Sequence, residues 1–479
     1  MSFFINLKNN IISFISSFRN PQSINIYKKV GKITFPAFLE LFLMALLNVV
    51  NMVMVSRLGV HAISSVGITN QPFFLLLAFS FAVNVGTTTL VSWSMGKNDK
   101  KQASFVAKQA ILFNLFLGSI MAATGHFGAR FFMPLMIDDP VIITYSTQFL
   151  ELKSLGLIFQ AATMSISASF RGAGLTKIPM FYNLAASIVH ICLNFLLIYG
   201  NLGFPRLEIT GAAISTIFAQ FFAFILGLTI ITFWKKSPIR IKLTGPWIPH
   251  IKTIKDITAI GIPAAGEQFV IQTGLLIYTR ILSSLDTAAF AAHQIAININ
   301  TMAFSVSQAF SISNTALVGR ACGMNDYNLA ENYTVHAMRL ARISTAIVTL
   351  AFIIFSVQII GIYTADPMVI NFAIPVFYVM AINQYVQSAQ MTISGALRGS
   401  GDTLYPLYAS IVGIWGFRII LALFFVFVLN WGVVGGWLAF VLDQMGRSIV
   451  VRRRFKSGKW RQMKAKREEK MKARQQKLT

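Results

Sequence analysis

A dozen stretches of about 20 mostly apolar residues, separated by short polar turns, dominate this sequence. A helix needs about 20 apolar residues to cross about 30 Å of hydrocarbon. Only 12% of the residues are charged, against roughly 25% in soluble domains. The pattern therefore predicts an all-α polytopic membrane protein. We place its twelve spans at 34–55, 71–94, 104–125, 142–167, 179–200, 210–233, 258–282, 293–318, 335–360, 369–395, 405–428 and 432–451.

The basic residues predict how the chain is oriented. The formal net charge is +25, but most of the Lys and Arg residues lie between or after the apolar stretches, which argues against nucleic-acid binding. They gather in 96–101, 235–255 and the tail from Arg452, whereas the alternate loops have few. Because Lys and Arg favour cytoplasmic loops, we expect both termini to face the cytoplasm. The tail is predicted to be a solvated helix that touches anionic lipid.

The two halves of the sequence repeat each other. One constant offset brings Pro36, Glu40 and Arg171 onto Pro263, Glu267 and Arg398, respectively. Apolar composition alone would not align Pro, Glu and Arg at a single offset. Six spans in each half is an even number, so the repeat is parallel, with its axis along the membrane normal.

The repeat predicts how the chain is divided. Two homologous six-helix lobes should be joined by one cytoplasmic linker, with a polar segment at each end of the chain. The predicted ranges are 1–33 for a cytoplasmic or interfacial N-terminus, 34–235 and 256–452 for the lobes, 236–255 for the linker and 453–479 for the basic tail.

Several runs resemble those of multidrug and toxic compound extrusion (MATE) transporters. They are FPAFLELFLMALLNVVNMVMVSRLG in the first predicted span, GIPAAGEQF and AAHQI in the seventh and eighth, and the paired loops FRGAGLT and LRGSGDT. The resemblance covers about residues 30 to 460. It implies a V-shaped pair of lobes in the bacterial inner membrane, and export of drugs or other organic compounds, cationic or amphipathic, in exchange for protons or sodium.

The resemblance and the residues together exclude other classes. No phosphate-binding loop of the Walker type occurs, so ATP-driven pumping is not expected. Asp99 and the Asp138–Asp139 pair do not form the clustered metal ligands of a membrane-bound transferase. We expect a monomeric transporter rather than an enzyme, without metal or cofactor beyond its coupling ion. A flippase for lipid-linked saccharides and an exporter of one metabolite remain alternatives.

Ionisable residues inside the spans are candidates for ion coupling, since a charge near the bilayer centre costs about 3 kcal/mol. Glu267 matches the glutamate that the family uses in its seventh helix, and Glu40 is its repeat partner. His293 begins the eighth span and could assist proton transfer beside Glu267. For each residue a purely structural hydrogen-bonding role is the alternative.

The cation site that the family has in its N-terminal lobe is altered in this sequence. Asn51 stands where the family has an aspartate, and His190 and Asn194 occupy a pattern that usually reads Asn and Asp. Thr216 would complete this remnant pocket. Because sodium needs anionic or dense oxygen ligands, the loss of these carboxylates favours protons over sodium as the coupling ion.

Two further groups of residues have expected positions. A polar set in the eighth and tenth spans should line a cavity of the C-terminal lobe, with inward packing as the alternative: Asn298, Asn300, Asn383, Gln387 and Gln390. Arg171 and Arg398 should lie in cytoplasmic loops with a structural role. Arg418, deep in a span, needs an acidic partner, and Asp443 and Glu267 are the candidates.

Overall fold

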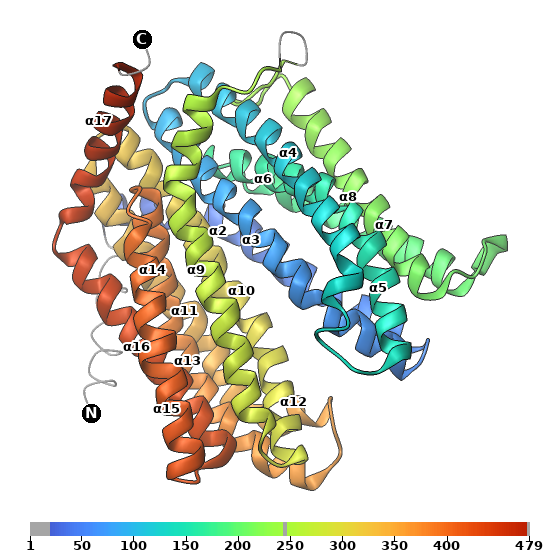
Figure 1. The fold of residues 1–479 in the computed structure, drawn as a ribbon. Helices are drawn as coiled ribbons and strands as arrows, with labels where there is room; N and C mark the ends of the chain where they lie inside the picture. Colours follow the sequence, from blue (N-terminus) through green and yellow to red (C-terminus); the bar gives the residue numbers. More distant parts are fainter. Residues whose placement is uncertain (1–19, 243–246, 477–479) are drawn as a thin grey trace. The chain divides into compact units, whose positions relative to one another are not determined.

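The computed structural model describes residues 20–242 and 247–476, and within these ranges the chain is helical, without strands (Figure 1). The predicted N-terminal interfacial helix before residue 20 lies outside the described residues. The helices pack into two units, residues 39–265 and residues 20–38 with 266–476, here called the N-terminal and C-terminal units. Two long helices contribute to both units, namely α2 (Pro21–Ser56) and α9 (Ile251–Ser283).

In the N-terminal unit, α6 lies at the centre and packs against α3, α4 and α8. The unit contains the second part of α2, the first part of α9, and α3 (Val60–Gly96), α4 (Lys100–Phe132), α5 (Pro140–Leu155), α6 (Leu157–Gly172), α7 (Lys177–Tyr199) and α8 (Glu208–Phe233). The predicted span 142–167 is broken: α5 and α6 meet at Gly156 with a bend of 47°.

In the C-terminal unit, α13 takes the central place and packs against α10, α11 and α16 (Figure 1). The unit contains α10 (Thr287–Gly323), α11 (Tyr327–Ile354), α12 (Ser356–Gly361), α13 (Pro367–Gly399), α14 (Leu404–Ile411), α15 (Ile420–Leu423), α16 (Gly432–Lys456) and α17 (Met463–Gln476). A π-helical stretch, Val412–Ile419, joins α14 to α15, and a second one, Phe424–Val428, follows α15, so these segments form one long helix.

The apolar character of the helices supports the membrane assignment. Within the described ranges, nine helices are long and apolar enough to cross a membrane, and the bent pair of α5 and α6 adds a tenth. The remaining two predicted spans lie in α10 and α16, which are long enough to cross a membrane but are not among these helices. Both α2 and α9 begin before their predicted starts, at Pro21 and Ile251, so the predicted linker already contains the first turn of α9.

The predicted repeat is visible in the positions where helices begin. The offset that relates Pro36 to Pro263 also relates the first residues of α3, α4, α5 and α7 to those of α10, α11, α13 and α14. The caps repeat as well: Asp99 accepts a hydrogen bond from the Gln102 N–H, and Asp326 accepts one from the Leu329 N–H, each at 2.9 Å. A helix N-terminus leaves such N–H groups unpaired, so the same residue type begins both helices in the same way.

The offset changes near the end of each half. A π-helical turn holds one more residue than an α-helical turn, and residues after the stretch 412–419 are accordingly matched one position later. The last helices, α8 and α16, start at Glu208 and Gly432, which is a slightly shorter offset than that of the other helices. The shorter offset of these two helices pairs Ala219 with Asp443, and Ala223 with Arg447.

The basic tail differs from its prediction, because its first part is docked on the protein. Lys464 is buried and its ammonium group donates a hydrogen bond to Asn325 Oδ1 at 2.7 Å. Arg467 Nε donates to the Gly401 carbonyl at 2.7 Å. Carbonyls and amides of the turns after α10 and α13 thus satisfy cations of α17, which follows η4 (Lys459–Gln462). The tail is therefore a structural part of the C-terminal unit.

Candidate functional site

Glu40, on α2, forms a buried ion pair in the N-terminal unit. Its Oε1 accepts hydrogen bonds from Arg171 Nη2 at 2.7 Å and from Asn183 Nδ2 at 2.6 Å. Arg171 was expected in a loop, but it lies in the last turn of α6, where its side chain reaches back to α2. The glutamate is 2% exposed, so the pairing compensates a charge that would otherwise be costly to bury.

Glu267, on α9, forms the equivalent pair in the C-terminal unit. Arg398 Nη2 lies 2.8 Å from both carboxylate oxygens, and Ser410 Oγ donates to Oε1 at 3.5 Å. Arg398 also lies in the last turn of its helix, α13, rather than in a loop. The offset between Glu40 and Glu267 also relates Asn183 to Ser410, so all three members of the site repeat. The contribution of Asn183 and Ser410 was missed, although the repeat offset applied to both.

The C-terminal unit extends this site into a larger buried charge network. Arg418 pairs with Asp443, one of its two expected partners, and its Nε donates to Oδ2 at 2.9 Å. Arg447 Nε donates to Oδ1 of the same aspartate at 2.7 Å, and its Nη1 lies 3.4 Å from Ser410 Oγ. Ser410 thereby connects the Glu267 pair with the triad Arg418–Asp443–Arg447, all members of which are at most 5% exposed.

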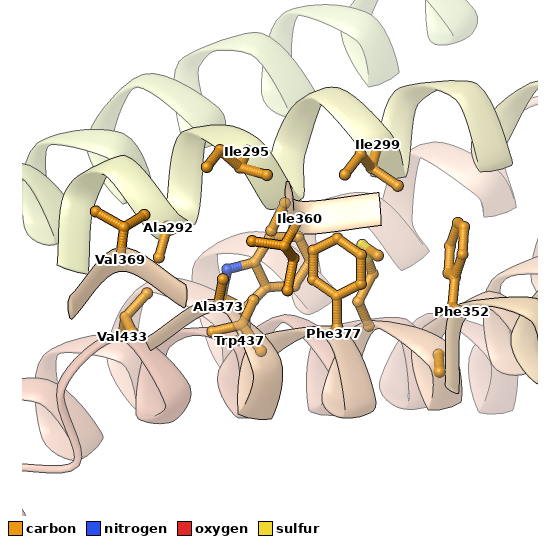
Figure 2. Close-up of a cluster of buried hydrophobic side chains, with 14 of the residues drawn as sticks. Ala292, Ile295, Ile299, Phe352, Ile360, Val369, Ala373, Phe377, Val433 and Trp437 are labelled. Carbon is orange, nitrogen blue, oxygen red and sulfur yellow. The ribbon is translucent and has the colours of Figure 1, made fainter. Parts of the chain in front are cut away.

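His293 does not lie beside Glu267 as expected. Its ring packs against Tyr278, Phe290 and Trp437, with ring centroids 5.7, 6.0 and 5.9 Å away. Tyr278 is three helical turns after Glu267 on α9, which is about 16 Å. The imidazole therefore belongs to an aromatic cluster that includes Trp437, one of the core residues in Figure 2.

Four of the five polar residues expected at a C-terminal cavity are packed between helices instead. Asn383 is fully buried, and Gln387 and Gln390 are at most 4% exposed. Asn300 is buried too and accepts a hydrogen bond from Gln384 Nε2 at 2.8 Å. Asn298 is exposed, and its amide donates to the Gln294 carbonyl of its own helix. The described contacts thus favour the alternative of inward packing.

The four residues of the remnant cation pocket do come together. Asn194 Nδ2 donates to Asn51 Oδ1 at 2.5 Å, and Thr216 Oγ1 lies 3.2 Å from His190 Nε2. Among the described residues, no carboxylate takes part in these contacts. The arrangement offers amide, hydroxyl and imidazole groups, which suit a neutral hydrogen-bonding ligand better than sodium.

Three of these residues, Asn51, His190 and Thr216, line a cavity of about 590 Å³ within the N-terminal unit. Glu40 and Arg171 line one part of the cavity and His190 lines another. The cavity also exposes Lys153, in the last turn of α5, whose Nζ donates to Asn70 Oδ1 at 3.0 Å. Sequence reasoning overlooked Lys153, although a lone lysine inside the predicted span 142–167 was a sufficient reason to consider it.

Comparison with known proteins identifies a family with this architecture. The MatE family model matches residues 36–196 and 263–424, two segments whose first residues are related by the repeat offset. A probable multidrug resistance protein NorM of Thermotoga maritima is 28% identical over 437 residues, covering 91% of this chain and 93% of the relative. The multidrug resistance protein PmpM of Pseudomonas aeruginosa is 28% identical over 380 residues, covering 77% of each chain.

Solved structures share the fold. A MOP superfamily transporter from Pyrococcus furiosus, described as having a binding pocket of reversed polarity, superposes with a TM-score of 0.84 at 19% identity over 90% of this chain and 96% of its own. An outward-facing MATE transporter gives a TM-score of 0.84 at 20% identity over 91% and 97%. With a family model on both halves, the chain belongs to the MatE family of membrane transporters, which includes multidrug resistance proteins and whose members are not enzymes.

Proposed function

We propose that this chain exports amphipathic organic compounds from the cell in exchange for protons, with Glu267 as the coupling carboxylate. The observation that supports the proposal is the buried pair of Glu267 with Arg398. A buried carboxylate must be paired or protonated, because an isolated charge is too costly there. A proton on Glu267 and the ion pair with Arg398 are therefore alternatives.

Because a proton on Glu267 and the ion pair with Arg398 exclude each other, proton binding would change the conformation of the protein. Protonation would free Arg398 from α9 and leave the last turn of α13 to find other partners. A ligand shifts a conformational equilibrium by its different affinities for the two states. One charge crossing 100 mV provides about 2.3 kcal/mol, which corresponds to roughly fifty-fold accumulation. The pair of Glu40 with Arg171 offers the N-terminal unit the same exchange.

Protons suit this site better than sodium. Each glutamate already has a guanidinium group against its carboxylate, and a metal ion would have to approach that positive charge. A proton attaches to one oxygen and removes the attraction outright. Of the two predicted substrate classes, amphipathic compounds are favoured over cations, because the carboxylate at the 590 Å³ cavity, that of Glu40, is already paired. The proposed orientation, with both termini in the cytoplasm of a bacterial inner membrane, rests on the basic loops.

The test is transport by the purified chain in lipid vesicles. A panel of one cationic, one neutral and one anionic amphipathic dye is offered under a proton gradient or a sodium gradient. We expect proton-driven transport of at least one dye, and loss of that transport in Glu267→Gln. The matched control is Glu469→Gln, an exposed glutamate of α17, which should transport normally. Full transport by Glu267→Gln, or transport driven by sodium alone, would refute the proposal.

A further inference from the structure

The cavity of the N-terminal unit holds a positive charge that is not paired with a carboxylate. Lys153 Nζ has one hydrogen bond, to Asn70 Oδ1, and lies 4.2 Å and 5.2 Å from the ring centroids of Phe73 and Phe149. In the described part of the chain no carboxylate lies within 4.0 Å of this ammonium group. A lysine ammonium carries three donors, so two of its N–H groups remain available to a ligand.

The remaining charges of the cavity compensate one another. Glu40 is the only acidic residue among the described residues that line it, and this carboxylate is held by Arg171 and Asn183. With His190 neutral, the charges of Glu40 and Arg171 cancel, and the positive charge of Lys153 is left over. Lys153 is partly buried, and moving an unpaired charge out of water has a free-energy cost. A bound anion would offset that cost, whereas a bound cation would add to it.

The walls of the cavity define the rest of the ligand. Aromatic and thioether side chains from four helices supply apolar surface, among them Phe73, Phe74 and Met164, and amide groups such as Gln160 supply a few polar contacts. Small-molecule sites of this kind measure about 300–1,000 Å³ and combine apolar walls with a few polar groups. A volume of about 590 Å³ is far larger than an inorganic anion, so the cavity suits an organic acid with a flat apolar body.

We infer that this cavity binds aromatic compounds with a single carboxylate, which pairs with Lys153 while the ring system lies among Phe73, Phe74 and Phe149. The inference narrows the substrate class of the proposed export and rests on that function for its physiological meaning. The binding itself needs no gradient, so it can be tested separately.

The experiment measures binding of 2-naphthoate and 2-naphthamide to the purified full-length chain in detergent by titration calorimetry. The two probes share their ring system and differ in one negative charge. We expect naphthoate to bind at least tenfold more tightly than naphthamide. Lys153→Met should abolish this preference, and Lys153→Arg should retain most of it. Lys177→Met removes an exposed lysine at the start of α7 and should leave the preference unchanged.

Two results would overturn the inference. One is equal affinity of the native chain for both probes, and the other is an unchanged preference in a Lys153→Met variant whose melting temperature shows that it is folded. If naphthoate preference is lost with Lys153 while Glu267→Gln still transports dye, the cavity assignment stands and the coupling proposal fails. If the probes bind equally but transport requires Glu267, the reverse holds.

Discussion

The same position of the repeat is a ligand-sized cavity in one unit and a filled core in the other. Lys153, at the cavity of the N-terminal unit, corresponds to Met380, which is fully buried in the hydrophobic cluster of the C-terminal unit (Figure 2). The helix there is broken in one unit at Gly156, whereas α13 passes the corresponding Asn383 without a break. A duplicated scaffold has thus kept its backbone plan and changed what its interior can hold.

The side chains of the last helices explain where the space comes from. Ala219 and Ala223 of α8 line the cavity. Their counterparts on α16, at the shorter offset of these two helices, are Asp443 and Arg447, whose charged groups fill the interior and bind Arg418 or each other. Small residues leave room for a ligand, and a satisfied charge network leaves none. The two units therefore share the Glu–Arg pair, while the ligand-sized space belongs to the N-terminal unit.

The largest effect should follow when the lysine is placed in the wrong unit. Met380→Lys puts an ammonium group into a dry apolar cluster. Burial of an unpaired ion costs several kcal/mol even after relaxation, so we expect a loss of unfolding free energy of about 4–7 kcal/mol. The reciprocal Lys153→Met should be neutral or stabilising. Denaturant unfolding of both purified variants measures the difference, and equal losses would show that the two interiors are alike.

A smaller effect is expected when the charge network of the C-terminal unit is opened. Asp443→Ala leaves the guanidinium groups of Arg418 and Arg447 buried without this carboxylate. Such a change typically costs about 3–5 kcal/mol, measured as a lower unfolding free energy. Asp138→Ala, at an exposed position, is the control and should change it by less than about 0.5 kcal/mol. A network that tolerates Asp443→Ala would not explain why this interior is closed.

The smallest effect should separate the two shared ion pairs. The Arg398 side chain is 10% exposed and that of Arg171 is 22% exposed, so water can compensate Arg171 more readily. Glu267→Gln should therefore lose about 1 kcal/mol more unfolding free energy than Glu40→Gln. Parallel unfolding curves of the two variants check this ranking. A larger loss of unfolding free energy in Glu40→Gln would mean that the exposed fractions of the arginines do not determine how much each ion pair stabilises the protein.

Much of the fold was predictable because its information is periodic. Helix length and the repeat offset are enough to predict the apolar spans and the shared positions of Glu40 and Glu267. The ion pairs could have been anticipated from the same offset, since Arg171 and Arg398 repeat with the two glutamates. Only their position was predicted wrongly, because the glycine-rich turns begin after these arginines and not before them.

The rest depends on packing in three dimensions. Whether amides such as Asn383 line a cavity or pack inward is decided by neighbouring helices, whose side-chain volume no local pattern reports. His293 lies away from its expected partner because two residues of adjacent helices can differ by three turns in height. The sequence presents Lys153 as a lone lysine inside a span, but the cavity around it depends on the break at Gly156 and on the neighbouring helices.

The division of α2 between the two units has a consequence for biosynthesis. The first part of this helix packs with the C-terminal unit, where the Tyr27 and His336 ring centroids are 4.8 Å apart. These rings are separated by about 300 residues of chain, and ribosomes add roughly 5–20 residues per second. The segment around Tyr27 must therefore wait roughly 15–60 seconds before its packing partner has been translated. During that interval we expect an insertase or a chaperone to bind the segment around Tyr27.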